Sequence, residues 1–124
     1  MTNLDALITN PGLLTAGRTY AQVLLDTRNL LSEHDRWNQG TFAVTADGQS
    51  TNPTDQEACR WCLLGAMARC SSDLGIIPPQ LLRFVEGMMH FVYGDQFATI
   101  GEMNDYIDHQ SLLDFVDQCI RRFG

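Results

Sequence analysis

The chain has 124 residues, 44% hydrophobic and 19% charged, which is typical of one globular domain with its own core and excludes a disordered tail. Its formal net charge is −7, and all eight of its basic residues are arginine. Because such a domain lacks the basic surface that supplies most nucleic-acid affinity, we expect neither direct nucleic-acid binding nor attachment to an anionic membrane.

The whole chain, residues 1–124, is predicted to form a single helical domain, with residues 1–18 as an N-terminal arm. No apolar run approaches the ~20 residues that span a bilayer. The N-terminus also shows neither a signal peptide nor a lipidation motif. These features predict a cytoplasmic protein, in which the four cysteines are reduced thiols.

The first predicted element is an amphipathic helix. From Thr19 onward, apolar residues recur at three- and four-residue spacing, and the pattern ends near Asp35. Residues 41–45 then alternate weakly ahead of a turn at Asp47-Gly48. This second pattern predicts a short strand, a hairpin or an ordered loop after the first helix.

The second predicted helix covers about Asp55 to Cys70. Thr54 and Glu57 have the spacing of a capping box, in which each side chain binds the backbone amide of the other residue. Pro53, just before this box, also agrees with a helix start.

Two further helices are predicted in the second half of the chain. One begins near Pro78-Pro79 and stops at Gly94; it is apolar on most of its circumference, so we expect it to be central. After an irregular link, Asp108 or Ser111 caps a last helix. The predicted fold is therefore mainly α, a small single-domain bundle of about four helices with a short hairpin or ordered loop between the first two. The expected inward face of the last helix consists of Leu112, Leu113, Val116, Cys119, Ile120 and Phe123.

Residues 57–70, EACRWCLLGAMARC, hold three of the four cysteines. On a helix, the small residues at 58, 62, 65 and 66 would let a neighbouring helix approach closely, with Trp61 as the large buried contact. Cys59-x-x-Cys62 supplies only half of a zinc spacing, and no second pair follows it. We therefore interpret the thiols as small buried hydrophobes and predict neither a metal site nor a cofactor.

A catalytic alternative uses a thiol nucleophile. Cys62 or Cys59 would attack, and His90 or His109 would act as the base. Cys59 is the better placed thiol, since a helix N-terminus lowers the pKa of a thiol. The simpler interpretation makes His90 a core residue on an apolar helix face and His109 a solvated residue at a helix start.

Four short motifs occur in a distinctive order: Trp-Asn-Gln-Gly at 37–40, Asn-Pro-Thr-Asp at 52–55, Trp-Cys-x-x-Gly-Ala at 61–66, and Asn-Asp at 104–105. Over residues 20–122, this order resembles an uncharacterised family of small bacterial and phage proteins, known only as a domain of unknown function. Met103 stands where that family carries an aromatic residue. The resemblance implies a helical fold and no particular activity.

The resemblance also implies that the motif residues lie together, either as a core with a polar clasp or as an active site. The grouped positions are Trp37, Gly40, Trp61, Cys62, Gly65, Asn104 and Asp105. The candidate binding residues are Trp37, Gln39, Asn104 and Asp105.

Two functions from different classes remain open. The favoured one is a non-catalytic, acidic interaction domain that binds another protein, because no complete catalytic set is visible. One form of it is a phage-type inhibitor of a host defence complex, similar in style to anti-CRISPR proteins, that presents carboxylates where phosphates would lie. The alternative is a small thiol-dependent enzyme that uses Cys62 or Cys59 with a histidine base.

Overall fold

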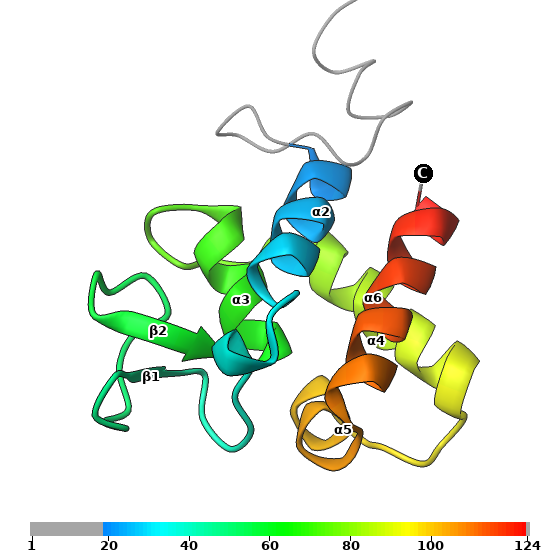
Figure 1. Ribbon diagram of the computed structural model, residues 1–124. Coiled ribbons are helices and arrows are strands. Elements are labelled where there is room, and N and C mark those ends of the chain that lie inside the picture. The colour runs from blue at the N-terminus through cyan, green and yellow to red at the C-terminus, as the bar shows by residue number, and fades with distance from the viewer. Residues whose placement is uncertain (1–18, 124) are drawn as a thin grey trace, which may run out of the picture.

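The computed structural model describes residues 19–123, where five α-helices pack with one small sheet (Figure 1). The mainly helical class is confirmed, with one α-helix more in this range than the four expected. The predicted N-terminal arm, residues 1–18, lies outside the described residues. No helix within 19–123 has both the length and the apolar character that crossing a membrane requires. The elements are α2 (Tyr20–Leu30), the 3-10 helix η1 (His34–Arg36), β1 (Ala43–Thr45), β2 (Ala58–Trp61), α3 (Leu63–Ser71), α4 (Pro79–Tyr93), α5 (Ile100–Tyr106) and α6 (His109–Phe123).

The first helix, α2, starts as predicted but ends early. The Thr19 hydroxyl accepts a hydrogen bond from the amide of Gln22 and caps the helix. The helix stops at Leu30, where Nε of Arg36 donates to the Leu30 carbonyl at 2.7 Å. The predicted end near Asp35 was wrong because the three- and four-residue spacing continues through a turn and η1, which are not α-helical.

Residues 43–45 form a short strand, one of the alternatives predicted after the first helix, but its partner strand lies beyond the predicted segment. β1 and β2 pair antiparallel, with Ala43 opposite Trp61 and Thr45 opposite Ala58. The register shifts beside Val44, so Cys59 has no partner in the ladder. The partner strand, β2, lies in the segment that was expected to be helical.

The helix predicted from Asp55 to Cys70 was wrong in its first half. The capping box does not form, because the Glu57 amide donates to the Asp55 carboxylate at 3.0 Å within a turn. The helix α3 begins only at Leu63, and Cys62 is its N-cap. Local signals favoured a helix at residues 55–62, but pairing with β1, which is distant in sequence, stabilises a strand there instead.

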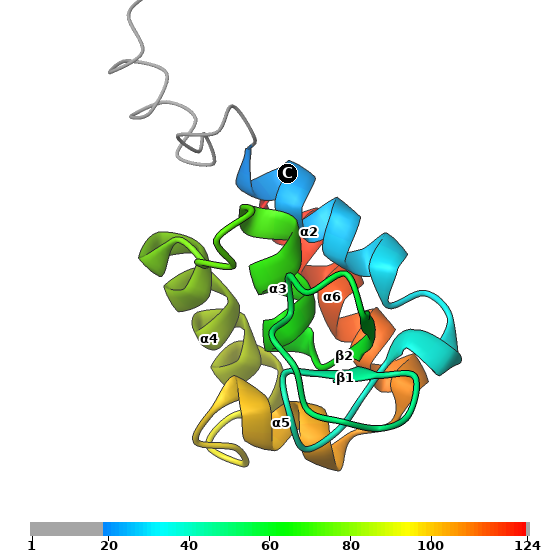
Figure 2. The same cartoon turned by 90° about the vertical axis from the view of Figure 1, so that its left-hand side faces the viewer.

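The central helix is α3 and not α4. Seven of the nine residues of α3 are buried, and Figure 2 shows this helix between α2 and α4. The bounds predicted for α4 are confirmed, with Pro79 in its first turn and Gly94 after its last residue. Its apolar circumference misled the prediction, since α4 buries only one face and leaves Phe91 exposed.

The last two helices are α5 and α6, and the sequence prediction missed α5. The short α5 occupies the expected irregular link; the Thr99 hydroxyl accepts from the Glu102 amide, and the Glu102 carboxylate accepts from the Ala98 amide. The last helix, α6, follows after Asp108, whose carboxylate accepts from the Ser111 amide at 2.8 Å and so supplies the cap. Its predicted inward face is confirmed: Leu112, Leu113, Val116 and Cys119 are buried, and Ile120 and Phe123 pack against the core.

Candidate binding site around Asn104

The site is centred on the side chain of Asn104, which is fully buried near the end of α5. Its Oδ1 accepts from the indole Nε1 of Trp37 at 2.8 Å and from the amide of Leu63 at 3.0 Å. Its Nδ2 donates to the carbonyl of Asn38 at 3.0 Å and to Oδ1 of Asp105 at 3.1 Å. The two lone pairs and two protons of the amide are thus all used. One side chain therefore ties the 37–38 segment and the start of α3 to α5.

Gln39 and Asp105 complete this arrangement. The Nε2 of Gln39 lies within hydrogen-bond distance of the carbonyls of Asn104, Asp105 and Ile107, at 3.1, 3.0 and 3.3 Å, and so covers the open end of α5. Oδ1 of Asp105 also accepts from the amide of Gly40 at 2.9 Å. Gly40 has φ of +106°, a conformation that side chains disfavour. The four candidate binding residues therefore lie together; with Gly40 we call them the polar clasp, which consists of Trp37, Gln39, Gly40, Asn104 and Asp105.

A hollow of about 290 Å³ opens beside the polar clasp. The carboxylate of Asp105 and the thiol-bearing residue Cys62 both line it, on different elements. Both described hydrogen bonds of Asp105 as an acceptor use Oδ1, so Oδ2 is left to accept from a ligand. We call this space the polar hollow; its lining is Gly40, Thr41, Phe42, Ser50, Thr51, Cys62, Leu64, Gly101 and Asp105.

A second depression, of about 420 Å³, lies on the other side of Phe42 and Leu64. It runs between α3, the start of α4, the loop that joins these two helices and the segments before and after β1. Nearly all of its lining is apolar, and none of it is charged. We call it the apolar groove; it is lined by Phe42, Asn52, Pro53, Leu64, Gly65, Ala68, Leu74, Gly75, Ile77 and Leu82.

The backbone of Phe42 touches α3 directly at Gly65. A Cβ built on Gly65 would stand 1.9 Å from the carbonyl oxygen of Phe42, so only glycine fits. The same carbonyl accepts from the Cys62 amide at 3.2 Å. The small residues of this segment were predicted to admit another helix; at Gly65 the close neighbour is instead the loop before β1.

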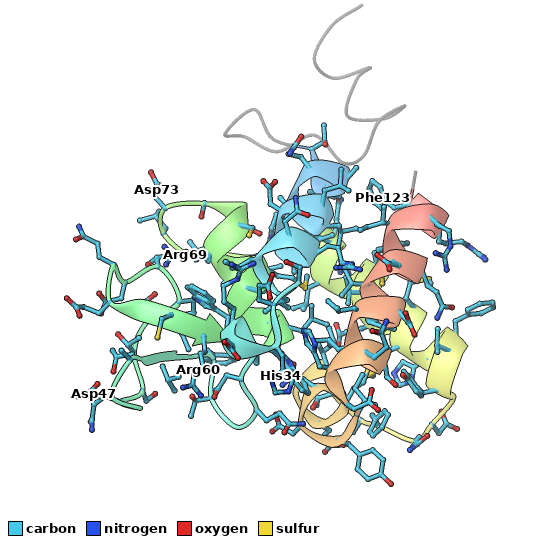
Figure 3. The ribbon with its side chains drawn as sticks, viewed as in Figure 1. His34, Asp47, Arg60, Arg69, Asp73 and Phe123 are labelled. Carbon is cyan, nitrogen blue, oxygen red and sulfur yellow. The ribbon has the colours of Figure 1, made fainter. Side chains whose placement is uncertain are left out.

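Arg69 on α3 holds the loop between β1 and β2 in place. Its guanidinium donates to the carbonyls of Pro53 and Asp55, at 2.9 and 3.0 Å, and lies 4.9 Å from the ring centre of Trp61. The Trp61 indole also donates to the Pro53 carbonyl, at 3.0 Å. Figure 3 shows Arg69 on the same side of the molecule as Asp73, in the turn that follows α3. These contacts fix the Pro53 wall of the apolar groove.

The match to known families covers this whole arrangement, since the family of unknown function DUF6197 matches residues 15–122. The chain belongs to this family. No curated protein and no solved structure matches the chain. We therefore infer a function for this DUF6197 protein from its own geometry.

The cysteines of this DUF6197 protein are all free, and three of the four are buried. Burial raises the pKa of the Cys62 thiol above its ordinary value, although the Gly65 amide donates to its sulfur at 3.3 Å. Burial likewise raises the pKa of Cys119 to about 12. Cys59, expected in the first turn of a helix, lies on β2 instead, so no helix N-terminus acts on it.

The histidines have other partners. His90 is exposed, and its Nδ1 donates to the Gly94 carbonyl at 3.0 Å, so its interpretation as a core residue was wrong. His109 was expected to be solvated but is half-buried, with Nε2 donating to the Leu31 carbonyl at 2.7 Å. Its ring packs against that of His34, which lies on η1, and that of Trp37, with ring centroids 5.2 and 5.6 Å away.

The positions of the histidines and cysteines limit the chemistry that the site can perform. The described hydrogen bonds of His90 and His109 go to backbone carbonyls and not to a cysteine. Within residues 19–123, no three His, Cys, Asp or Glu side chains are grouped to hold a metal ion. The site combines the Asp105 carboxylate, several hydroxyls and an adjoining apolar groove.

Proposed function

We propose that this DUF6197 protein is a non-catalytic interaction domain that binds another protein through the apolar groove. The observation that carries this proposal is a patch of large apolar side chains in and beside the groove. Phe42, Leu74 and Ile76 are 58%, 79% and 62% exposed, respectively. Contiguous exposed apolar surface of this kind marks interaction sites, because a partner gains free energy by removing it from water.

The charge of the chain narrows the choice of partner. A formal net charge of −7 favours a partner with a basic surface and speeds their encounter. The phage-type inhibitor of a nucleic-acid-handling defence complex is one form of this proposal, supported by charge and size. Four free cysteines agree with a cytoplasmic setting for either form.

The thiol-enzyme alternative has less support. A nucleophilic cysteine needs a lowered pKa and a base within hydrogen-bond reach. Burial raises the pKa of Cys62, and His109 donates to Leu31. Thiol labelling, described below, tests this alternative separately.

Site-specific photocrosslinking in the native cell tests the proposal. A benzoylphenylalanine placed at Leu74 should yield a discrete adduct with a partner protein. Leu25 on α2, which is also an exposed apolar residue, provides the matched control position and should yield none. The adduct should disappear when Phe42→Ser is added. Equal adducts from both positions, or none from Leu74, would overturn the proposal.

A further inference from the structure

We infer that the partner docks through a segment in which an arginine or lysine adjoins apolar residues, with the apolar residues in the groove and the cation in the polar hollow. This inference rests on the proposed function and adds the chemistry of the docking segment. The cation meets the carboxylate of Asp105.

The two depressions form one continuous surface. Phe42 and Leu64 line both the polar hollow and the apolar groove, so these two side chains are the shared wall. Phe42 is more than half exposed at this wall. A single bound segment that fills the groove therefore reaches the hollow with its next side chains.

The charge of this surface selects a cation. Asp105 is the one charged residue among all those that line the hollow and the groove. It also lines the next depression along α5, where the other charged residue is Glu102. Since no basic side chain lines any of these three spaces, an acidic segment would find no counter-charge there, whereas an arginine or lysine finds a carboxylate.

The geometry of the hollow suits one long cationic side chain. The Gly40 amide and the Asn104 side chain hold Oδ1 of Asp105, so the carboxylate is already oriented before a ligand arrives. Oδ2 is free to accept from the cation, and the exposed Phe42 ring offers a face on which a guanidinium can stack. The volume of about 290 Å³ leaves room for one arginine or lysine side chain.

Selection from a library of random twelve-residue displayed peptides tests this inference on the full-length protein. Enriched peptides should carry Arg or Lys next to Leu, Ile or Phe. A synthetic copy of the most enriched peptide should bind Asp105→Asn roughly three- to tenfold more weakly than the parent protein, and its affinity should fall with added salt. The amide in this variant keeps the Oδ1 acceptor and removes the charge, so thermal unfolding should stay near that of the parent protein.

Two matched variants separate the inference from the proposed function. Asp114→Asn removes one negative charge from α6, away from the hollow, and should leave peptide binding unchanged. Leu74→Ser should weaken binding through the groove. If Leu74→Ser weakens binding while Asp105→Asn does not, the inference fails and the interaction domain stands. If no peptide is enriched, or the enriched peptides are acidic, the inference is overturned, and crosslinking at Leu74 still decides the proposed function.

Discussion

Removing the amide of Asn104 should destabilise the protein more than almost any other single polar substitution. In Asn104→Ala, three groups lose their partner at once: the indole N–H of Trp37, the amide of Leu63 and the carbonyl of Asn38. The Leu63 bond is buried, and Asn104 itself has no exposed surface, so water cannot replace the lost bonds without opening the clasp.

The magnitude follows from the number of unpaired groups. A buried donor or acceptor left without a partner costs about 1–3 kcal/mol. Because the Trp37 and Asn38 bonds are only partly buried, we expect a total loss of about 3–5 kcal/mol. Small domains are stable by about 5–15 kcal/mol, so the loss is a large share of the whole. The melting temperature should fall by roughly 10–20 °C.

Urea unfolding of Asn104→Ala, followed by circular dichroism, measures this loss. Asn29→Ala on the exposed side of α2 is the control and should change the free energy of unfolding by less than about 0.5 kcal/mol. A loss below about 1 kcal/mol for Asn104→Ala would show that water readily replaces the clasp, and would refute the argument that Asn104 holds three segments together.

Three further predictions follow from the packing and the thiols. Gly65→Ala should prevent stable folding or force the Phe42 loop off α3, because the new Cβ would stand 1.9 Å from the backbone oxygen of Phe42. NMR chemical shifts around residue 42 would show this displacement, and a native-like spectrum would contradict the prediction. Burial raises the pKa of Cys119 from 9.0 to about 12, so as the pH rises the thiol ionises in the unfolded chain first. The free energy of unfolding should therefore fall above about pH 9, by roughly 2 kcal/mol at pH 10.5. The decline should be smaller in Cys119→Ala. In native iodoacetamide labelling read by mass spectrometry, Cys59 should react first and Cys62 only on unfolding; fast labelling of Cys62 near neutral pH would instead favour the enzyme.

The helices that the sequence predicted well are those with signals inside their own segment. α4 has proline at its start and glycine after its end, and α6 has the Asp108 cap and a regular apolar face. α5 was missed because it has only seven residues, too few for a periodic pattern to stand out. Its start does carry a readable signal, the Thr-x-x-Glu spacing of Thr99 and Glu102, whose side chains accept from the Glu102 and Ala98 amides.

The error at residues 55–62 has a different physical origin. A capping box at Thr54 and Glu57 is a local preference worth about a kcal/mol, and competing contacts from elsewhere in the chain can exceed it. Here the competitors are the ladder with β1, the Trp61 bond to Pro53 and the Arg69 bonds to the same loop. None of these can be inferred from the spacing within the segment, since each joins residues from separate elements.

For the candidate site, the sequence predicted which residues lie together but not how they are arranged. The motif resemblance suggested that Trp37, Gly40, Asn104 and Asp105 belong together, and hydrogen bonds do join them. The sequence pattern, however, does not predict that the side-chain amide of Asn104 is buried, nor that both of its lone pairs and both of its protons take part in hydrogen bonds. Nor does it reveal the polar hollow, whose lining comes from segments far apart along the chain.

Asn104 and Asp105 are adjacent in sequence, yet their surroundings in the structure differ. Asn104 is saturated and buried, so a change there acts on folding and affects binding only through the loss of the folded state. Asp105 is exposed and keeps Oδ2 free, so Asp105→Asn should weaken binding while the fold persists. If both variants lost stability equally, the pair would be a single structural unit. If Asp105 binds the partner and Asn104 holds the fold, Asp105→Asn should lose binding and keep its stability, whereas Asn104→Ala should lose stability.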